Sequence, residues 1–172
     1  VLAVAALHLG RWDDAKAFAV EGTAVSERTG STRFAVTMRM VQAWIALEAQ
    51  RYDEAQRLSV GDRALAESGG WVNARQMSLL FGGASALALG RLTDAAADLE
   101  QLRDWHARER IVMDWYWEAQ LHAYLAELWL RRGDLERATI EASAARQAAN
   151  ATPERTWRSR SQVASAVVAI ER

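Results

Sequence analysis

Apolar and polar residues recur along this chain with the spacing of α-helices. Runs in which apolar and polar residues alternate one by one do not occur, and the good helix formers Ala, Leu, Arg and Glu dominate. Proline occurs once, at Pro153, so no other position forbids a helix interior. The pattern predicts an all-α fold of nine helices, at residues 1–9, 12–28, 31–49, 52–68, 71–89, 92–107, 110–132, 135–149 and 153–171.

Four similar hexads divide the chain at nearly regular intervals. GRWDDA begins at residue 10, and QRYDEA, GRLTDA and GDLERA follow; their last residues, the anchor alanines, are Ala15, Ala55, Ala95 and Ala138. The intervals of 40, 40 and 43 residues lie in the range that is typical of stacked repeats. We therefore expect one structural unit to occur four times.

Three further positions agree across the four repeats. A small residue stands twelve positions before each anchor alanine, a leucine eight before and a large apolar residue three before: Ala3, Ala43, Gly83 and Ala126; Leu7, Leu47, Leu87 and Leu130; Trp12, Tyr52, Leu92 and Leu135. Only Ala or Gly leaves room where two antiparallel helices cross closely, so the small residue is expected to face the anchor alanine. The leucine fills the space beside the crossing, where its burial contributes about 1.5–3 kcal/mol. The large apolar residue is expected to cap this core.

The predicted turns contain residues that end and begin helices. Glycines that suit the left-handed end of a helix stand at Gly10, Gly90 and Gly133. Gln50 takes the same position in the second repeat, where we expect a weaker stop. A second kind of turn separates the repeats at 30–32, 69–70 and 150–154, with Ser31 or Thr32 and then Thr152 as expected N-caps and Pro153 as the first helical residue of the last helix.

Over residues 1–149 these positions resemble those that define the tetratricopeptide repeat (TPR) family. The resemblance implies an α–α superhelix, a TPR-like solenoid of antiparallel helical hairpins in one domain, with repeats at about 1–29, 30–69, 70–109 and 110–150 and a partial fifth at 151–172. These units are about six residues longer than the usual 34, and the small residue that the family places seven after the anchor becomes Asp62 and Leu102 in the middle repeats. Such degenerate repeats are similar to those of large bacterial regulators, including ATP-binding transcriptional activators and nucleotide cyclases. We therefore expect a piece of a larger protein.

In a TPR-like superhelix the first helix of each hairpin lines an inner groove. Counting three- and four-residue steps from the anchor alanines places these residues in the groove: Arg33, Thr37, Met40, Trp44, Glu48, Asn73, Met77, Leu80, Tyr116, Gln120, Glu127, Arg131 and Arg160. Methionine and aromatic side chains beside isolated charges suit a bound peptide or amphipathic helix. The alternative is that Met40, Trp44 and Met77 pack between repeats, as apolar residues at helical spacing usually do.

The most aromatic stretch is DWYWEAQLHAYLAELWL, residues 114–130. Trp115, Tyr116 and Trp117 point about 100° apart in succession on a helix. These rings and Tyr124 therefore cannot all face one way, and some must be exposed or covered by a partner. We therefore expect an exposed aromatic surface that favours interaction near the start of this helix.

Candidate chemistry is sparse. His8, His106 and His122 lie in separate repeats without the HExxH spacing of a zinc site, and the nearest pair is His122 with Glu118. Gly82–Gly83 lacks the Lys-Ser/Thr of a phosphate loop. No Ser/His/Asp grouping or paired-carboxylate motif stands out either. The sequence therefore predicts no catalytic residue, metal or cofactor.

Composition narrows the classes of partner. Among 172 residues, 21 basic and 22 acidic side chains give a net charge of −1, which disfavours nucleic acid and anionic lipid. Arg155, Arg158 and Arg160 around Trp157 are expected to form a solvated helix face. The lack of cysteine excludes disulfides and thiolate sites. The opening VLAVAAL is too short to span a membrane, so we expect a cytoplasmic protein.

These observations favour a non-enzymatic interaction module that binds a protein or peptide and has a regulatory or scaffold role. Its partners would include flanking domains of the same chain or a second copy. The alternative is a sensor that binds a small ligand in the groove and controls an attached effector domain. A closed pocket of about 300 Å³ or more lined by Trp44, Met77 and Tyr116 would favour the sensor, and an open groove would favour a peptide.

Overall fold

The computed structural model describes residues 2–109, 113–152 and 155–171, and every regular element in these ranges is an α-helix. The helices are α1 (Leu2–His8), α2 (Trp12–Arg28), α3 (Thr32–Glu48), α4 (Tyr52–Gly61), α5 (Arg63–Ser68), α6 (Val72–Ala88), α7 (Leu92–Arg108), α8 (Asp114–Arg131), α9 (Leu135–Asn150) and α10 (Arg155–Ile170). The all-α prediction is confirmed. Each of the nine predicted helices is present, and the fourth is interrupted. None of the described helices is long and apolar enough to cross a bilayer.

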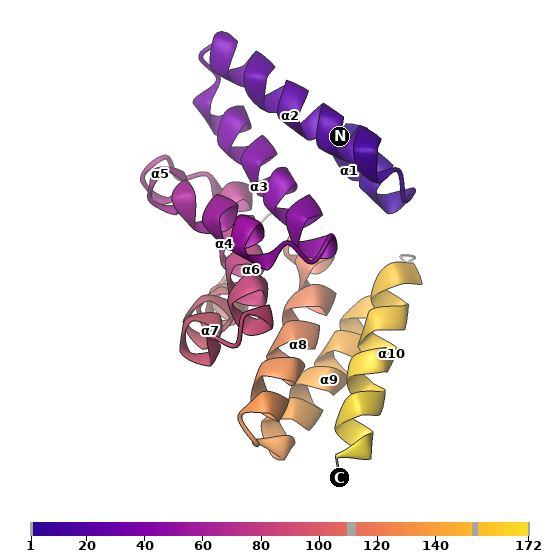
Figure 1. Ribbon diagram of the computed structural model, residues 1–172. Helices are drawn as coiled ribbons and strands as arrows, with labels where there is room; N and C mark the ends of the chain where they lie inside the picture. Colours follow the sequence, from indigo (N-terminus) through magenta and orange to yellow (C-terminus); the bar gives the residue numbers. More distant parts are fainter. Residues whose placement is uncertain (1, 110–112, 153–154, 172) are drawn as a thin grey trace. The chain divides into compact units, whose positions relative to one another are not determined.

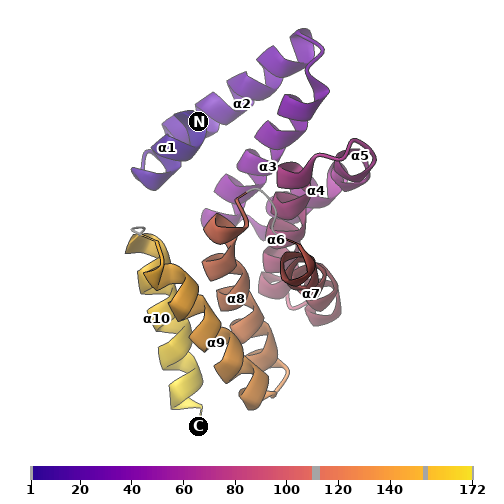
Figure 2. The same ribbon diagram turned by 180° about the vertical axis from the view of Figure 1, so that it is seen from behind.

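The chain forms two compact units, Val1–Leu89 and Gly90–Arg172. In the first unit α2 packs against α1 and α3, and α4 packs against α3 and α6. In the second unit α8 packs against α7 and α9, and α10 lies beside both α8 and α9, as Figures 1 and 2 show from opposite sides. The boundary falls inside the third predicted repeat, residues 70–109, so one continuous domain stays a prediction.

Alternate helices also touch within each unit. In the first unit α3 contacts both α1 and α6, and in the second unit α8 contacts α10. The indole of Trp44 carries the contacts of α3: its centroid lies 5.5 Å from the His8 ring in an edge-on arrangement and 5.7 Å from the Phe81 ring in a stacked one. Contacts between helices one hairpin apart are what a stack of hairpins requires.

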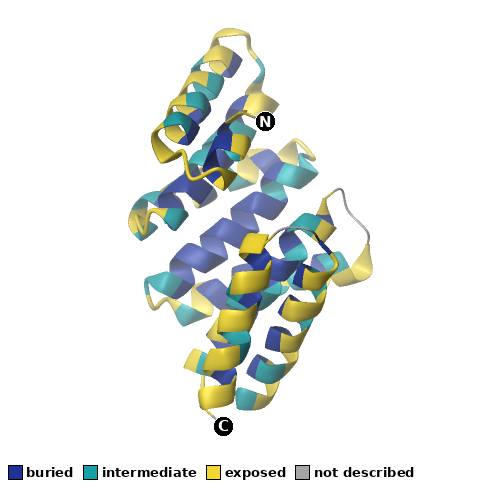
Figure 3. Cartoon of the chain, turned by 90° about the vertical axis from the view of Figure 1, so that its right-hand side faces the viewer, coloured by how far each residue is buried: buried dark blue, intermediate teal, exposed yellow. Residues whose placement is uncertain are grey.

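The anchor alanines share one environment. Ala15, Ala55, Ala95 and Ala138 are each 0% exposed. The small residues expected to face them, and three of the four predicted leucines, are buried as well: Ala3, Ala43, Gly83 and Ala126; Leu7, Leu47 and Leu87. Figure 3 shows buried positions along the helix faces that meet one another. The predicted positions are therefore buried, and the facing of each small residue toward its anchor alanine at a helix crossing stays a prediction.

Two of the repeated positions differ from the prediction. Leu130 is only half-buried, because it borders a cleft described below. Trp12, which was expected to cap the hairpin core, is 44% exposed, more than the equivalent Tyr52, Leu92 and Leu135, which are half-buried. The Trp12 indole instead lines a hollow between the start of α2 and the end of α3, beside Lys16 and Glu48.

The turns repeat every 20 residues through the first five connections. Residues with positive φ stand at Gly10, Gly30, Gln50, Gly70 and Gly90, with φ of 71°, 71°, 58°, 63° and 75°. At the first four, that residue donates its N–H to the carbonyl three positions back, and the next residue donates to the carbonyl five back. For Gly10 and Arg11 these bonds end at Leu7 and Ala6, at 3.0 and 2.9 Å. This is the Schellman pattern of helix termination.

The 40-residue repeat is therefore two copies of a shorter element. α2, α3, α6 and α7 each contain 17 residues. A helix of this length followed by a three-residue turn gives the 20-residue interval. Side-chain capping at the helix starts contributes less than expected: Ser31 occupies the N-cap of α3 but makes no side-chain capping bond. Asp134 does cap α9, by accepting from the Arg137 N–H at 3.0 Å.

Thr152, the expected cap of the last helix, donates its hydroxyl backwards to the Ala149 carbonyl at 3.2 Å. Pro153, the expected first residue of that helix, lies outside the described residues, as does the expected helix start at residue 110.

The predicted helix at 52–68 is broken at Asp62. A side chain from α6 takes part in the break: the Ser78 hydroxyl donates to the Ser59 carbonyl at 2.6 Å. Arg63, the first residue of α5, donates in turn to the Ser78 hydroxyl at 3.0 Å and to its carbonyl at 3.2 Å. Insertion of a side chain into the helical ladder is a recognised cause of a kink. No local sequence pattern announces such an insertion, because its donor comes from another helix.

An ion pair holds the broken end in place. The Arg39 guanidinium on α3 bonds the Asp62 carboxylate and also contacts Glu27 on α2, at 2.7 Å. The pKa of Arg39 is raised above its ordinary value, chiefly because Asp62 accepts a hydrogen bond from it. Asp62 stands where the family resemblance implies a small residue. Its carboxylate links the break between α4 and α5 to α3 through Arg39.

Gln50 tests the turn. A residue with a side chain is strained by about 1–2 kcal/mol in the left-handed conformation, whereas glycine is not. Gln50→Gly should therefore raise the free energy of unfolding by about 1 kcal/mol, measured by urea denaturation. The matched control is Gly90→Gln, which introduces the same strain at the equivalent turn and should lower the free energy of unfolding by a similar amount. The account is contradicted if Gln50→Gly does not stabilise the protein, or if Gly90→Gln stabilises it as well.

Ala15 tests the helix crossing. Ala15→Leu places three extra carbon atoms at a position with 0% exposure and should destabilise the protein by about 1–3 kcal/mol through overpacking. Ala17 lies on the same helix and is exposed, so Ala17→Leu should change stability by less than about 0.5 kcal/mol. Thermal melts followed by circular dichroism would separate the two variants; equal melting temperatures would show that Ala15 does not mark a close crossing.

Candidate functional site

A cleft of about 460 Å³ lies between α8 and α10. α8 and α10 each contribute six residues to its lining: Gln120, Ala123, Tyr124, Glu127, Leu130 and Arg131; Trp157, Arg160, Val163, Ala164, Val167 and Val168. Within each helix these residues recur at steps of three and four, so each set forms one face. The small side chains of Ala123 and Ala164 leave space where larger residues would close the gap.

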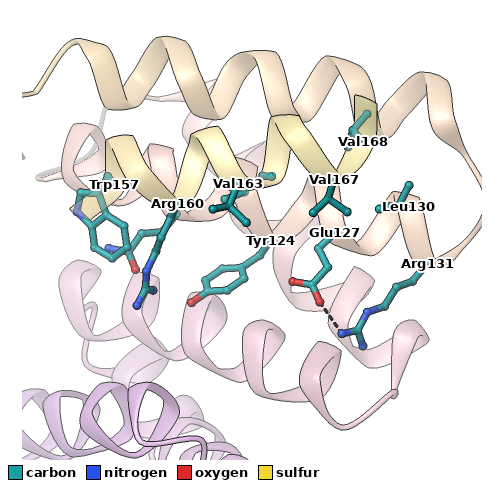
Figure 4. Close-up of a pocket in the computed structure, with 12 residues that line it drawn as sticks. Tyr124, Glu127, Leu130, Arg131, Trp157, Arg160, Val163, Val167 and Val168 are labelled. Atoms are coloured by element: carbon teal, nitrogen blue, oxygen red, sulfur yellow. Dashed lines mark hydrogen bonds and ion pairs between the residues drawn. The ribbon is translucent and has the colours of Figure 1, made fainter. Parts of the chain in front are cut away.

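The cleft is elongated along two parallel helices. Figure 4 shows Trp157 and Arg160 at one end and Val168, Leu130 and Arg131 at the other, with Tyr124 and Val163 between them. α8 and α10 run in the same direction because α9, which is antiparallel to both, connects them. Each lining set extends over twelve residues, whose eleven steps correspond to about 16 Å of helix. The hollow is therefore a short groove between neighbouring first helices of two predicted repeats.

Two buried residues with polar groups line one end of the cleft. Gln120 is 2% exposed and Trp157 is 3% exposed. Neither the amide oxygen nor the amide nitrogen of Gln120 has a hydrogen-bond partner among the described residues, and the same holds for the indole N–H of Trp157. An amide or indole N–H left unpaired in a protein interior costs about 1–3 kcal/mol. Both groups line the same cleft at the same end.

The rim carries exposed apolar and charged side chains. Val163 and Val167 are 62% and 42% exposed, although they border a cleft whose floor is apolar. Glu127 and Arg131 form an ion pair with each other on the surface of α8. At the opposite end the Arg160 guanidinium lies 5.2 Å from the centre of the Trp157 ring. The charged side chains that line the groove are therefore Glu127, Arg131 and Arg160, and the first two pair with each other.

The structure brings four of the predicted groove residues together in this cleft: Gln120, Glu127, Arg131 and Arg160. The others do not line it. Tyr116 lies on α8 ahead of the cleft, half-buried, with its ring edge-on to Trp115 and Trp117. The aromatic stretch behaves as its spacing predicts, since Trp115 is 54% exposed and Trp117 is buried.

The remaining predicted groove residues belong to the first unit. Met40, Trp44 and Met77 are buried there, with exposures of 0%, 2% and 3%. Of the others, one is exposed, three are half-buried and one is buried: Arg33; Thr37, Glu48 and Asn73; Leu80. The Trp44 indole donates to Glu48 at 3.2 Å. A role of these residues in binding stays a prediction.

Sequence reasoning missed most of the α10 side of the cleft. It counted groove positions from the anchor alanines, and the last helix is followed by no anchor, so only Arg160 was placed there. Trp157 was assigned to a solvated basic face, but its ring is buried. A signal was present: Trp157 precedes Arg160 by three residues, and Ala164 and Val168 follow it by four and eight, which is the spacing of one helix face.

α8 is fixed against its other neighbours by a buried carboxylate. Glu141 on α9, 6% exposed, accepts from His122 Nδ1 at 2.6 Å and from Arg103 on α7 at 3.4 Å. Burial lowers the pKa of Arg103, but its hydrogen bond to Asp104 and the charge of Glu141 outweigh this and raise the pKa overall. His122 therefore pairs with a residue of another helix, and Glu118, the neighbour that the sequence suggested, is not that partner.

Metal chemistry has no geometric basis in the part of the chain that the structure describes, since no group of three or more His, Asp or Glu side chains could hold an ion there. Gly82 and Gly83 lie inside α6 and are buried, in a helix where a phosphate-binding loop would need an open turn.

The buried carboxylate gives a testable expectation. Glu141→Ala leaves His122 and Arg103 without their shared acceptor and should lower the free energy of unfolding by about 1–3 kcal/mol. Glu136 lies on the same helix and is exposed, so Glu136→Ala serves as the control and should have a much smaller effect. Urea denaturation of both variants checks this. Equal stabilities would mean that the cluster does not hold the three helices together.

Comparison with known proteins gives no match: no family model, no curated protein and no solved structure is similar enough to this chain to assign it.

Proposed function

We propose that this chain is a non-enzymatic binding module that takes a peptide segment of a partner protein into the cleft between α8 and α10. The observation that carries the proposal is the groove itself: about 16 Å of apolar floor between parallel helices, bordered by the exposed valines Val163 and Val167. Exposed apolar side chains along a hollow are typical of interaction surfaces.

The architecture that we propose for the module is a TPR-like superhelix. Direct contacts between alternate helices within each unit, the shared burial of the anchor alanines and the 20-residue interval of the turns support it. In such an array the first helices of successive hairpins face the same side. A groove between α8 and α10 then belongs to the inner face, on which we place the partner.

The role that fits such a module is regulatory or scaffolding, inside a larger bacterial signalling or transcription-regulatory protein. Three features support this proposal: the helical repeats, a mostly apolar groove, and a net charge of −1 that offers no general attraction to nucleic acid. Flanking domains of the same chain and a second copy of this chain are further candidate partners.

One observation favours a small-ligand sensor as the second candidate. The cleft volume of about 460 Å³ lies within the range of small-molecule pockets, about 300–1,000 Å³. From the sequence, a closed pocket lined by Trp44, Met77 and Tyr116 would favour a sensor, but none of these residues lines the cleft. The elongated cleft beside the two exposed valines of α10 favours a chain segment over a compact molecule.

Selection from a random peptide library displayed on phage tests the proposed function. The full chain should enrich peptides that contain apolar residues, and Val163→Glu should abolish that enrichment because it places a charge on the apolar rim. Ile170→Glu is the matched control: Ile170 lies on the same helix, is 80% exposed and does not line the cleft, so this variant should enrich the same peptides.

Two results would contradict the peptide proposal. The first is no enrichment by the full chain over uncoated support. The second is enrichment that Val163→Glu leaves unchanged. Saturable binding of a metabolite in a thermal-shift screen, lost in Val163→Glu and without any peptide enrichment, would instead support the sensor.

A further inference from the structure

We infer that the end of the cleft formed by Gln120 and Trp157 is a subsite for a main-chain amide of an extended, uncharged and apolar peptide segment. The inference rests on the proposed function and specifies how the partner is recognised. It starts from the two buried polar side chains of the cleft that have no hydrogen-bond partner among the described residues.

The side-chain amide of Gln120 offers an oxygen that accepts and a nitrogen that donates, both unused. A group that satisfies them together must present a donor and an acceptor close to each other. One residue of an extended chain does this, because its own N–H and C=O point to the same edge of the chain and are free. A carboxylate would leave the Gln120 oxygen unpaired, and an ammonium group would leave its nitrogen unpaired.

Trp157 adds a second donor at the same end. Its indole N–H is buried and unpaired, and it can only donate. A further carbonyl of the same segment would satisfy it. The subsite therefore asks for two acceptors and one donor from a ligand that is otherwise apolar, which is the composition of a short stretch of polypeptide backbone.

An α-helical ligand does not meet this demand. Carbonyl and N–H groups within a helix are bonded to each other and are free only at its ends. An extended segment exposes them throughout, and at about 3.3 Å per residue some five residues fill the 16 Å groove.

The valines of the rim match the same geometry. Val163 and Val167 lie one helical turn apart, about 6 Å along α10. Side chains at positions i and i+2 of an extended chain are about 6.6 Å apart and point to the same side. Two apolar side chains of the segment can therefore rest on the two valines while its backbone reaches Gln120.

This assignment predicts opposite effects of one substitution on stability and binding. Gln120→Met keeps the length of the side chain and removes both unpaired polar atoms, so the free protein should melt at the same or a higher temperature. A glutamine with only a structural role would behave in the opposite way. Gln76 is the matched control, because it is buried and engaged by a partner: Gln76→Met should lower the melting temperature.

Binding is measured with a blocked dipeptide, N-acetyl-leucyl-leucine N-methylamide, and with its ester analogue, in which the central N–H is replaced by oxygen. The reporter is the indole N–H signal of Trp157 in ¹⁵N-labelled full chain, identified among the eight tryptophans with Trp157→Phe. The dipeptide should shift this signal saturably. Its dissociation constant should rise about tenfold for the ester analogue and at least tenfold in Gln120→Met, since each loses a buried hydrogen bond.

The outcomes separate the inference from the proposed function. If display-selected peptides and the dipeptide bind wild type and Gln120→Met equally but fail to bind Val163→Glu, the amide subsite is wrong and the peptide groove stands. If N-methylacetamide shifts the Trp157 signal as tightly as the dipeptide, the subsite serves a small amide and the peptide assignment is wrong. If no peptide from the selection shifts that signal, the inference fails, and absence of any enrichment overturns the proposed function too.

Discussion

The structure depends on the close crossing of helices at alanine. An alanine with no exposed surface recurs in α2, α4, α7 and α9, and small side chains are the only ones that allow two backbones to approach at that point. The buried alanines hold the hairpins together, and a left-handed residue at each of the first five turns fixes where those helices end. Helices of 17 residues separated by three-residue turns follow from these two constraints.

The cleft arises from the same packing. α9 contacts both α8 and α10, and it makes these two helices run parallel with their faces toward each other. Where both faces carry alanine, at Ala123 and Ala164, the helices do not fill the space between them. A groove is the result. Its position is set by two small residues and its length by the three turns over which the helices stay adjacent.

Gln120 shows how stability and binding can diverge in such a groove. Burial of an amide with no partner costs free energy in the unbound protein. A ligand that supplies the missing donor and acceptor removes this free-energy cost on binding. A ligand without them binds more weakly, because it leaves the amide buried and unpaired. Two unpaired polar groups at one end of a mostly apolar cleft thus fix the orientation of a bound segment and favour ligands that carry main-chain amides.

The sequence by itself determined the helical class, the close-packed positions and the turns. It could do so because helix periodicity, the size of a crossing residue and the left-handed conformation of a glycine are local properties. Gln50, where a weaker stop was expected, has the same positive φ and the same pair of turn hydrogen bonds as the glycines of the two neighbouring turns. It also placed Gln120, Glu127 and Arg131 on the helix face that borders the cleft.

Only the tertiary structure decided the rest. The break at Asp62 depends on Ser78 of another helix, and the partner of His122 is Glu141, 19 residues away. The choice of α8 and α10 as the walls of a groove, and the lack of a partner for Gln120 among the described residues, are likewise products of packing. A sequence lists the donors and acceptors of each side chain, but whether two of them meet depends on how helices distant in sequence pack against each other.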